Sequence, residues 1–215
     1  MSIITIERKV LEKNDEIAQQ NRAVFKEKRI FVINLVSSPG SGKTSLLERT
    51  LEKTGKEINI AVIEGDVQTD FDAQRIARYN VPVVQIVTHG ACHLEAQLVR
   101  DALKNINLDT TQLLIIENVG NLVCPAGYDL GENYKIVLVS TTEGDDKPLK
   151  YPAMFRNASV LIINKIDLTP YLSSNLEVLK KNALQINPSL RVFTTSCTTD
   201  EGINEWCEWL KMNLK

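Results

Sequence analysis

The residues of this chain best suited to chemistry lie in a glycine-rich segment that ends in a lysine and a threonine. Residues 35–45 read Leu-Val-Ser-Ser-Pro-Gly-Ser-Gly-Lys-Thr-Ser and stand between an apolar run and an amphipathic helical pattern. Backbone N–H groups of such a loop can surround a polyphosphate, while the Lys43 ammonium reaches its outer oxygens and the Thr44 hydroxyl ligates Mg²⁺. We therefore expect a phosphate-binding loop formed by Ser38, Pro39, Gly40, Ser41, Gly42, Lys43, Thr44 and Ser45.

A second polar segment could recognise the base of a nucleotide. Asn-Lys-Ile-Asp at residues 164–167 follows the apolar run 160–163, and Ser196 and Cys197 follow the last apolar run. The Asp167 carboxylate is an acceptor, so it can pair with N1–H and the exocyclic amine of guanine, whereas adenine offers no such donor pair. We therefore expect a guanine nucleotide, held by Asn164, Lys165, Asp167, Ser196 and Cys197.

Acidic residues after two other apolar runs could handle Mg²⁺ and the reacting phosphate. Asp66 is expected to ligate the ion directly or through water, together with Thr44; the alternative is that it only caps the next helix. Glu117 ends a further run, and the N–H of Gly120 could bond the γ-phosphate. We expect Lys43, Asp66, Glu117 and Gly120 to be the catalytic residues, which position and stabilise the transferring phosphoryl group.

Sulfur and imidazole side chains could form a separate metal site. Cys92 and His93 are adjacent at the start of an expected helix, and Cys124 lies a few residues after Glu117. These three side chains would form a cluster if their two loops meet at one end of the sheet. Thiolate and imidazole ligands suit Zn²⁺ and Ni²⁺. Packing in the core or capping of a helix is the alternative for each side chain.

The elements that must position these residues alternate between apolar runs and amphipathic patterns. Most of the runs are continuous, which is typical of a parallel sheet covered by helices on both faces. Strands are expected at residues 30–36, 58–63, 83–87, 113–117, 135–140, 160–163 and 192–195. Helices are expected at residues 44–54, 70–79, 93–104, 149–155, 175–186 and 204–214. The fold class is therefore α/β, with a doubly wound, mostly parallel sheet of about seven strands.

Length and charge limit the class further. The 215 residues fit a single domain over 1–215, with an N-terminal helix at 1–28 before a core at 29–215. A net charge of −2 gives no general attraction to nucleic acid or anionic membranes, and no apolar run is long enough to span a bilayer. The first residues do not resemble a signal peptide, so we expect a cytoplasmic protein whose four cysteines are reduced, without a disulfide framework.

Further segments are informative together with the phosphate-binding loop. They are Glu64-Gly-Asp66, Ala91-Cys-His-Leu-Glu95, Glu117-Asn-Val-Gly-Asn-Leu-Val-Cys-Pro125, Asp146-Lys-Pro-Leu-Lys-Tyr-Pro152 and Asn164-Lys-Ile-Asp167. With these segments the chain resembles, over nearly its whole length, the HypB family of hydrogenase nickel-incorporation GTPases. The resemblance implies a P-loop NTPase of the dimeric GTPase type. It also implies that Cys92, His93 and Cys124 bind nickel or zinc, and that Lys147 lies on a loop that reaches the partner subunit's nucleotide.

The function implied by this resemblance is metal handling driven by a nucleotide. The protein would hydrolyse GTP to GDP and phosphate slowly, dimerise with GTP and metal, and pass nickel to a maturation metallochaperone or to the hydrogenase large-subunit precursor. GTP or GDP, Mg²⁺, and Ni²⁺ or Zn²⁺ are the implied cofactors. Alternatives are a urease-accessory GTPase, whose Cys-Pro-His motif differs from Cys124-Pro-Ala126 here, a P-loop small-molecule kinase, and a metal-binding adaptor without catalysis.

Overall fold

A seven-stranded sheet forms the centre of the computed structural model, which describes the backbone of residues 6–214 and the side chains of residues 10–214. The strand order is β3-β2-β4-β1-β5-β6-β7, and all neighbouring strands are parallel. The strands are β1 (Phe31–Ser37), β2 (Ile60–Asp66), β3 (Val83–Val87), β4 (Leu113–Glu117), β5 (Tyr134–Ser140), β6 (Val160–Asn164) and β7 (Arg191–Thr194). The expected doubly wound parallel sheet is confirmed.

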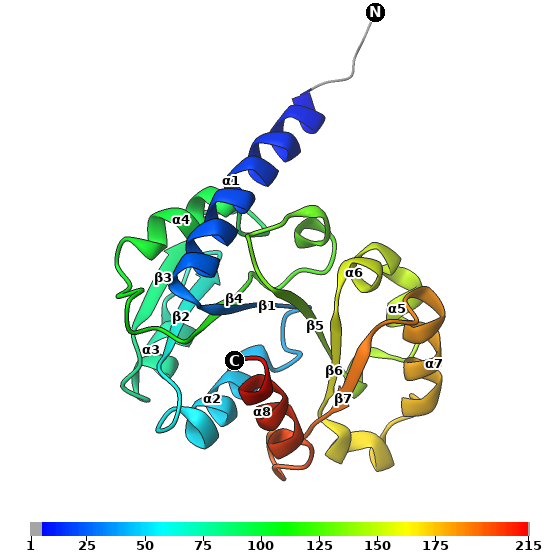
Figure 1. Cartoon of the computed structure of the whole chain (residues 1–215). Coiled ribbons are helices and arrows are strands. Elements are labelled where there is room, and N and C mark those ends of the chain that lie inside the picture. The colour runs from blue at the N-terminus through cyan, green and yellow to red at the C-terminus, as the bar shows by residue number, and fades with distance from the viewer. Residues whose placement is uncertain (1–5, 215) are drawn as a thin grey trace, which may run out of the picture.

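Helices cover both faces of this sheet (Figure 1). The α-helices are α1 (Ile6–Lys28), α2 (Lys43–Thr54), α3 (Phe71–Ala77), α4 (Ala96–Leu103), α5 (Lys147–Lys150), α6 (Pro152–Asn157), α7 (Leu176–Ile186) and α8 (Ile203–Met212). Short 3-10 helices are η1 (Cys124–Gly127), η2 (Thr141–Glu143) and η3 (Ile166–Tyr171). Apolar residues of α2, α3 and α8 pack on one face, and those of α1, α4, α6 and α7 pack on the other.

The position of β1 determines where a ligand can bind. It lies in the middle of the sheet between β4 and β5, so the chain fills one side of the sheet before it crosses to the other. In open parallel sheets a crevice forms outside the carboxyl ends of the strands at such a switch point. The loop between β1 and α2, which holds the predicted phosphate-binding residues, begins there.

Most helices begin and end within two residues of the expected positions, and two differ more. The helix expected at 149–155 is two short helices, α5 and α6, because Pro152 has no N–H to continue the first helix and instead starts the second. The helix expected at 93–104 begins only at Ala96, after Glu95 in an extended conformation. Cys92 and His93 therefore lie in the loop before α4. The N-terminal helix is confirmed from Ile6, and residues 1–5 of that prediction lie outside the described residues.

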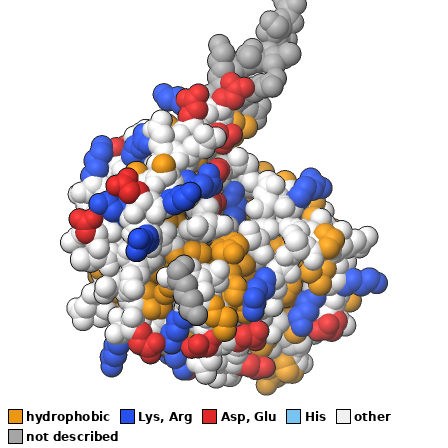
Figure 2. All heavy atoms as spheres, viewed as in Figure 1, with side chains coloured by type: hydrophobic (Ala, Val, Ile, Leu, Met, Phe, Trp, Pro, Cys, Tyr) orange, Lys and Arg blue, Asp and Glu red, His pale blue; other side chains and the backbone are white. Residues whose placement is uncertain are grey.

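The surface carries charges of both signs. On the face shown in Figure 2, the Lys and Arg side chains are interspersed with Asp and Glu, in agreement with the small net charge. Within the part of the chain that the structure describes, no helix is both long and apolar enough to cross a membrane.

Candidate nucleotide and metal sites

At two positions of the loop between β1 and α2, the backbone adopts a conformation that favours glycine. Gly40 and Gly42 have φ angles of 74° and 101°, in the left-handed region. A Cβ added at Gly42 would also collide with the side-chain amide of Asn164, which donates a 3.1 Å hydrogen bond to the Ser41 carbonyl. The loop is thereby held against the end of β6, and α2 begins directly after it with Lys43 and Thr44.

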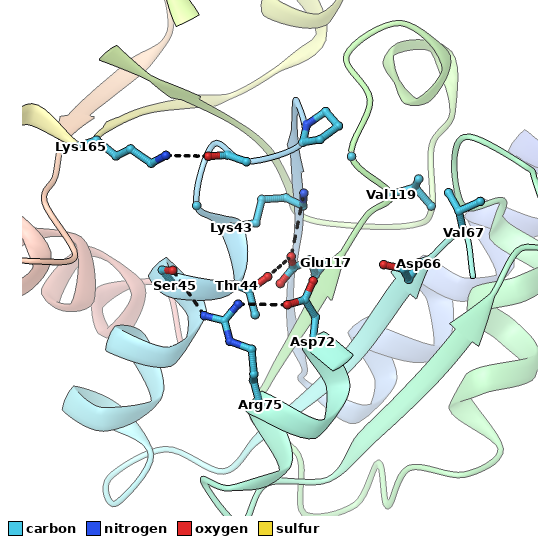
Figure 3. Close-up of a pocket in the computed structure, with 15 residues that line it drawn as sticks. Lys43, Thr44, Ser45, Asp66, Val67, Asp72, Arg75, Glu117, Val119 and Lys165 are labelled. Atoms are coloured by element: carbon cyan, nitrogen blue, oxygen red, sulfur yellow. Dashed lines mark hydrogen bonds and ion pairs between the residues drawn. The ribbon is translucent and has the colours of Figure 1, made fainter. Parts of the chain in front are cut away.

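A cavity of about 490 Å³ opens beside this loop (Figure 3). Its walls come from the loop after β1, the ends of β2 and β4, the starts of α2 and α3, and the residue after β6, which are far apart in the sequence. The lining residues are Pro39, Gly40, Gly42, Lys43, Thr44, Ser45, Gly65, Asp66, Val67, Asp72, Arg75, Glu117, Val119, Gly120 and Lys165. All of the expected catalytic residues are among them.

The side chains of Lys43 and Thr44 both point to Glu117 (Figure 3). Oε1 of Glu117 accepts a 2.9 Å hydrogen bond from the Thr44 hydroxyl and lies 3.9 Å from the Lys43 ammonium. Gly120, three residues later, runs so close to the loop that an added Cβ would lie 3.1 Å from Cγ of Pro39. The end of β4 therefore contacts the phosphate-binding loop through both a side chain and the backbone.

Asp66 does not cap the next helix, which begins at Phe71. Its Oδ1 accepts hydrogen bonds from the N–H groups of Gln68 and Thr69, at 2.8 and 3.0 Å, so it caps the turn after β2. Burial opposes ionisation of this carboxyl, but the hydrogen bonds outweigh burial and lower its pKa. Asp66 is thus a charged carboxylate at the edge of the cavity, as a Mg²⁺ ligand must be.

Two more carboxyl groups in this region were not among the expected site residues. Glu64 lies directly opposite Glu117 in the β2–β4 ladder, and Asp72 reaches the same place from α3. One carboxylate oxygen from each of Glu64, Asp72 and Glu117 lies within 4.8 Å of the other two. Burial raises the pKa of Glu64 to about 11, and the neighbouring Glu117 adds to the shift. Burial also raises the pKa of Glu117.

This carboxyl cluster fits a hard divalent cation. One Oε2 atom on each of Glu64 and Glu117 is buried with no hydrogen-bond partner among the described residues. Adjacent buried acids of this kind are destabilising unless protons or a cation compensate them. Oxygen ligands from carboxylates and a hydroxyl are those that Mg²⁺ prefers. The oxygens of Glu64, Asp72 and Glu117 are therefore suited to hold a cation, together with the Thr44 hydroxyl that bonds Glu117. Asp66 offers a further carboxylate at the edge of the same cavity.

The expected base-binding residues lie beside this cavity, and only Lys165 lines it. The Lys165 ammonium donates a 2.7 Å hydrogen bond to the Gly40 carbonyl, and Asn164 accepts hydrogen bonds from the Thr195 hydroxyl and the Cys197 thiol. Burial raises the pKa of the Cys197 thiol to about 11. Asp167 follows in the half-buried η3, and Ser196 is buried, with its hydroxyl accepting from the N–H groups of residues 198 and 199.

Lys147 lies farther from the cavity, in α5. Its ammonium is 3.0 Å from Oε2 of Glu143 and stacks over the Tyr151 ring. Glu143 in turn accepts a 2.6 Å hydrogen bond from the Ser41 hydroxyl. Lys147 is thus connected to the phosphate-binding loop through one acidic side chain, although it does not line the cavity in this single chain.

Cys92, His93 and Cys124 are brought together at the end of the sheet. The loop before α4 and the start of η1 place their sulfur and nitrogen ligand atoms within 4.8 Å of one another. The two sulfur atoms are joined as a disulfide, which differs from the expectation of reduced cysteines. Sulfur atoms brought together in this way can also share one metal ion when they are reduced, because the ligand is then a thiolate.

The His93 ring is held in a position suited to metal binding. It packs on the Tyr128 ring with centroids 3.9 Å apart, and burial lowers its pKa, so the neutral imidazole that a metal needs predominates at neutral pH. Its Nε2 is buried without a hydrogen-bond partner among the described residues, and Oε1 of Glu95 lies 3.8 Å away. The other ring nitrogen, Nδ1, lies 3.7 Å from Sγ of Cys92, so it is the nitrogen that faces the Cys/His cluster and could bind a shared metal ion.

Comparisons with known proteins identify the family of this chain. Residues 31–194 match the family model described as CobW/HypB/UreG, nucleotide-binding domain. The hydrogenase maturation factor HypB of Azotobacter vinelandii is 51% identical over 209 residues, which cover 97% of this chain and 69% of that protein.

Solved structures give the same result. The structure of HypB from Helicobacter pylori in complex with nickel has a TM-score of 0.90 at 37% identity and covers 94% of this chain and 95% of its own. The structure of HypB from Archaeoglobus fulgidus has a TM-score of 0.89 at 39% identity and covers 95% of this chain and 100% of its own. This chain therefore belongs to the HypB family of hydrogenase maturation factors.

Proposed function

We propose that this protein is a metal-binding GTPase that helps to deliver nickel to a nickel–iron hydrogenase during its maturation. One observation carries the proposal: a single segment, residues 117–124, begins in the nucleotide cavity at Glu117 and ends in the Cys/His cluster at Cys124. A nucleotide at one end of this segment and a metal ion at the other would act on the same short piece of backbone.

In the proposed reaction the protein positions GTP and stabilises charge rather than forming covalent bonds to the substrate. Lys43 and the loop amides bind the phosphate oxygens, and Gly120 donates its N–H to the γ-phosphate. Thr44, Asp66 and Glu117 would hold Mg²⁺, which neutralises phosphate charge when bound. Apart from Asp66 and Glu117, no described side chain stands out as one that activates water, so we propose a low turnover.

Base recognition is proposed for the segments beyond the cavity. Asp167 would accept from the donors of guanine, while Asn164 and Lys165 support the loop through their hydrogen bonds to Ser41 and Gly40. A carboxylate placed against adenine would be left without these donors, and a buried unpaired acceptor is costly. This difference favours GTP over ATP.

Nickel is the proposed cargo of Cys92, His93 and Cys124, with Zn²⁺ as a competing ion. Two thiolates and a neutral imidazole are soft and borderline ligands that both ions accept. The cysteines must be reduced for this purpose. Three ligands leave a coordination position open, so a second copy of the chain, the receiving protein or water would complete the coordination shell.

GTP-dependent dimerisation is part of the proposal and is supported by exposed apolar side chains. Phe71, Val123 and Leu149 are 68%, 63% and 53% exposed, and each lies in a segment that follows the carboxyl end of a strand. They therefore stand on the side of the sheet that holds the nucleotide cavity. Large apolar side chains exposed at a functional edge are suited to a protein contact. A dimer across this edge would bring Lys147 toward the partner subunit's nucleotide.

The receiving partners are proposed to be a maturation metallochaperone and the hydrogenase large-subunit precursor in the cytoplasm. One experiment tests the core of the proposal: Ni²⁺ is titrated into the reduced protein with Mg·GTP, with Mg·GDP and without nucleotide, while the molecular mass in solution is recorded. We expect stoichiometric Ni²⁺ binding, GTP hydrolysis and a GTP-dependent mass increase. Absence of GTP turnover would favour a metal-binding adaptor, and phosphate transfer to an added acceptor would favour a kinase.

A further inference from the structure

A buried asparagine joins the nucleotide cavity to the Cys/His cluster. Asn118 follows Glu117 and is 1% exposed. Its Oδ1 accepts hydrogen bonds of 3.0 Å from the N–H of Val119 and of 3.0 Å from the N–H of Leu94. Val119 lines the cavity, and Leu94 directly follows His93. One side-chain oxygen therefore binds both the backbone beside the nucleotide cavity and the backbone beside the Cys/His cluster.

The side chain of Leu94 also contacts β2, whose end lines the nucleotide cavity. This side chain is fully buried and packs against Gly65 of β2, where an added Cβ would lie 2.8 Å from Cδ1 of Leu94. Gly65 stands between Glu64 and Asp66. The residue after His93 is thus fixed by its backbone to the end of β4 and by its side chain to the end of β2, the two strands that carry the acids of the cavity.

A second branch of hydrogen bonds runs from the same asparagine beneath the metal loop. The Asn118 amide donates to Oδ1 of Asn34 at 3.2 Å, and the Asn34 amide donates to Oε1 of Glu132 at 3.2 Å. Oε2 of Glu132 accepts a 2.7 Å bond from the N–H of Leu130, and the Lys135 ammonium lies 3.9 Å from Oε1. The side chains of this branch are buried and form one continuous chain.

Lys135 connects that branch to the other metal ligands. Its ammonium donates to the carbonyls of Pro125, Ala126 and Tyr128, at 3.2, 3.4 and 2.8 Å. Pro125 and Ala126 belong to η1, whose first residue is Cys124, and the ring of Tyr128 packs on the ring of His93. Lys135 therefore fixes both the turn that carries Cys124 and the ring that orients His93.

Such a buried polar network resists small displacements. A buried polar group that loses its partner costs free energy, so the partners of Asn118 and Lys135 move together or the hydrogen bonds break. If the Gly120 N–H turns toward a γ-phosphate, the adjacent Val119 N–H shifts relative to Asn118. That shift would be passed to Leu94 through the same oxygen, and to the carbonyls of η1 through Asn34, Glu132 and Lys135.

We infer that Asn118 is a positioning residue that makes the geometry of the Cys92–His93–Cys124 cluster depend on the nucleotide state. This inference rests on the proposed function, because it needs both GTP and nickel as ligands. Coupling between sites is a free energy that two ligands exert on each other reciprocally. Removing the Asn118 amide should therefore reduce the coupling free energy between nucleotide and Ni²⁺ by more than it reduces the binding free energy of either ligand alone.

The test measures that coupling in the reduced protein of 215 residues. The Ni²⁺ affinity is measured by calorimetry in Mg·GDP and in the Mg complex of a non-hydrolysable GTP analogue, and the thiolate-to-nickel absorption band is recorded in each state. We expect the two Ni²⁺ affinities to differ by about 5-fold or more in the unaltered protein. In Asn118→Ala the ratio should fall toward one and the absorption band should become the same in both states.

A second variant and a control accompany this measurement. Lys135→Met interrupts the other branch and should also lower the ratio, even if Asn118→Ala does not fold. Asn213→Ala is the matched control, because the Asn213 amide donates to the Trp209 carbonyl at the end of α8 and takes no part in this network. It should leave the ratio and the absorption band unchanged.

The outcomes separate the inference from the proposed function. An unchanged ratio in folded Asn118→Ala and Lys135→Met, with a clear ratio in the unaltered protein, would overturn the role of the network and leave the proposed function standing. Absence of Ni²⁺ binding or of GTP binding in the unaltered protein would instead overturn the proposed function, and the inference with it. Equal affinities in both nucleotide states of the unaltered protein would overturn the coupling alone.

Discussion

The Thr44 hydroxyl donates a 2.9 Å hydrogen bond to Oε1 of Glu117, which ties the first turn of α2 to the carboxyl end of β4. Glu117 is buried and faces Glu64 across the β2–β4 ladder. These two acids in register have more acceptor atoms than the surrounding protein satisfies. The negative charge of Glu117 is therefore the feature most directly linked to binding of a cation.

Replacing Glu117 by glutamine tests that link. The amide oxygen can still accept from the Thr44 hydroxyl, but the side chain no longer carries charge for Mg²⁺ or for the transition state. We expect single-turnover GTP hydrolysis to fall by roughly 10²-fold, the size typical of losing one stabilising group in an active site. Glu52→Gln, on the exposed side of α2, is the control and should hydrolyse GTP normally. Undiminished hydrolysis in Glu117→Gln would remove this residue from the catalytic group.

Asp167 is expected to determine base specificity. In Asp167→Asn the side-chain amide donates where the carboxylate accepted, so GTP affinity should drop by about 10- to 100-fold, or about 1–3 kcal/mol. Xanthine nucleotides, which carry a carbonyl in place of the guanine amine, should bind better than they do to the unaltered protein. Competition binding with GTP, XTP and ATP measures both changes, with Asp109→Asn on the remote surface as control. Equal binding of ATP and GTP by the unaltered protein would contradict the assignment.

The central strands, such as β4, could be predicted closely because they are buried on both faces, and the half-buried edge strand β3 is marked by a similar apolar run. Continuous apolar runs mark such strands whatever the tertiary context, and residues 113–117 and 83–87 were predicted with the observed bounds. Helix ends depend on local detail that an apolar pattern does not contain. Pro152 split one expected helix, and the extended backbone at Glu95 moved the start of α4 beyond His93.

The predicted site residues meet because nearly all of them follow the carboxyl end of a parallel strand. The site residues that the motifs did not predict are brought into place by strand pairing and packing. Glu64 joins the site through its register with Glu117, and Asn118 gains importance only because Leu94 and Asn34 lie beside it. Asp72 reaches the cavity only because α3 packs next to α2. Register and packing of this kind cannot be read from the spacing of residues in one sequence.

Nucleotide and metal binding should be separable by mutation. Lys43→Ala removes the cation that faces the polyphosphate, so GTP binding should weaken and hydrolysis should be lost, while Ni²⁺ binding without nucleotide is retained. Cys124→Ala should reduce Ni²⁺ affinity and leave GDP affinity within about 3-fold of the unaltered value, because typical couplings between sites are modest. Calorimetry on the reduced proteins checks both. Cys207→Ala, which removes a buried thiol in α8, is the control for loss of a cysteine.

Replacing all three proposed ligands tests whether they form the metal site. If the triple replacement of Cys92, His93 and Cys124 by alanine retains Ni²⁺ and Zn²⁺ affinity, the ions bind elsewhere. Oxidation gives an independent check, since the Cys92–Cys124 disulfide removes both thiolates. The oxidised protein should bind Ni²⁺ far more weakly than the reduced protein, and addition of a thiol reductant should restore binding. Equal Ni²⁺ affinity in both forms would exclude the two sulfur atoms as ligands.

Acid should weaken the attachment of α1 through Asp129. Both carboxylate oxygens of Asp129 lie 2.8 Å from the Arg22 guanidinium on α1, and the N–H of Gly131 donates to Oδ1 at 2.8 Å. Burial opposes ionisation, but the hydrogen bonds from Arg22 and Gly131 outweigh it and lower the pKa of Asp129 from 3.8. Because the folded pKa lies below the unfolded one, the pair stabilises the fold above about pH 4, and this stabilisation is lost as the pH falls through the lowered pKa.

The variant Arg22→Met isolates this contribution. Both partners are more than one-third exposed, so the free energy of unfolding should be lower in the variant by at most about 1 kcal/mol at pH 7. This difference should shrink toward zero as the pH is lowered from 5 to 3, because a protonated Asp129 no longer attracts the guanidinium. Urea unfolding of both proteins at several pH values measures the difference directly. A difference that stays constant down to pH 3 would show that Arg22 stabilises α1 through packing of its side chain and not through the charge of Asp129.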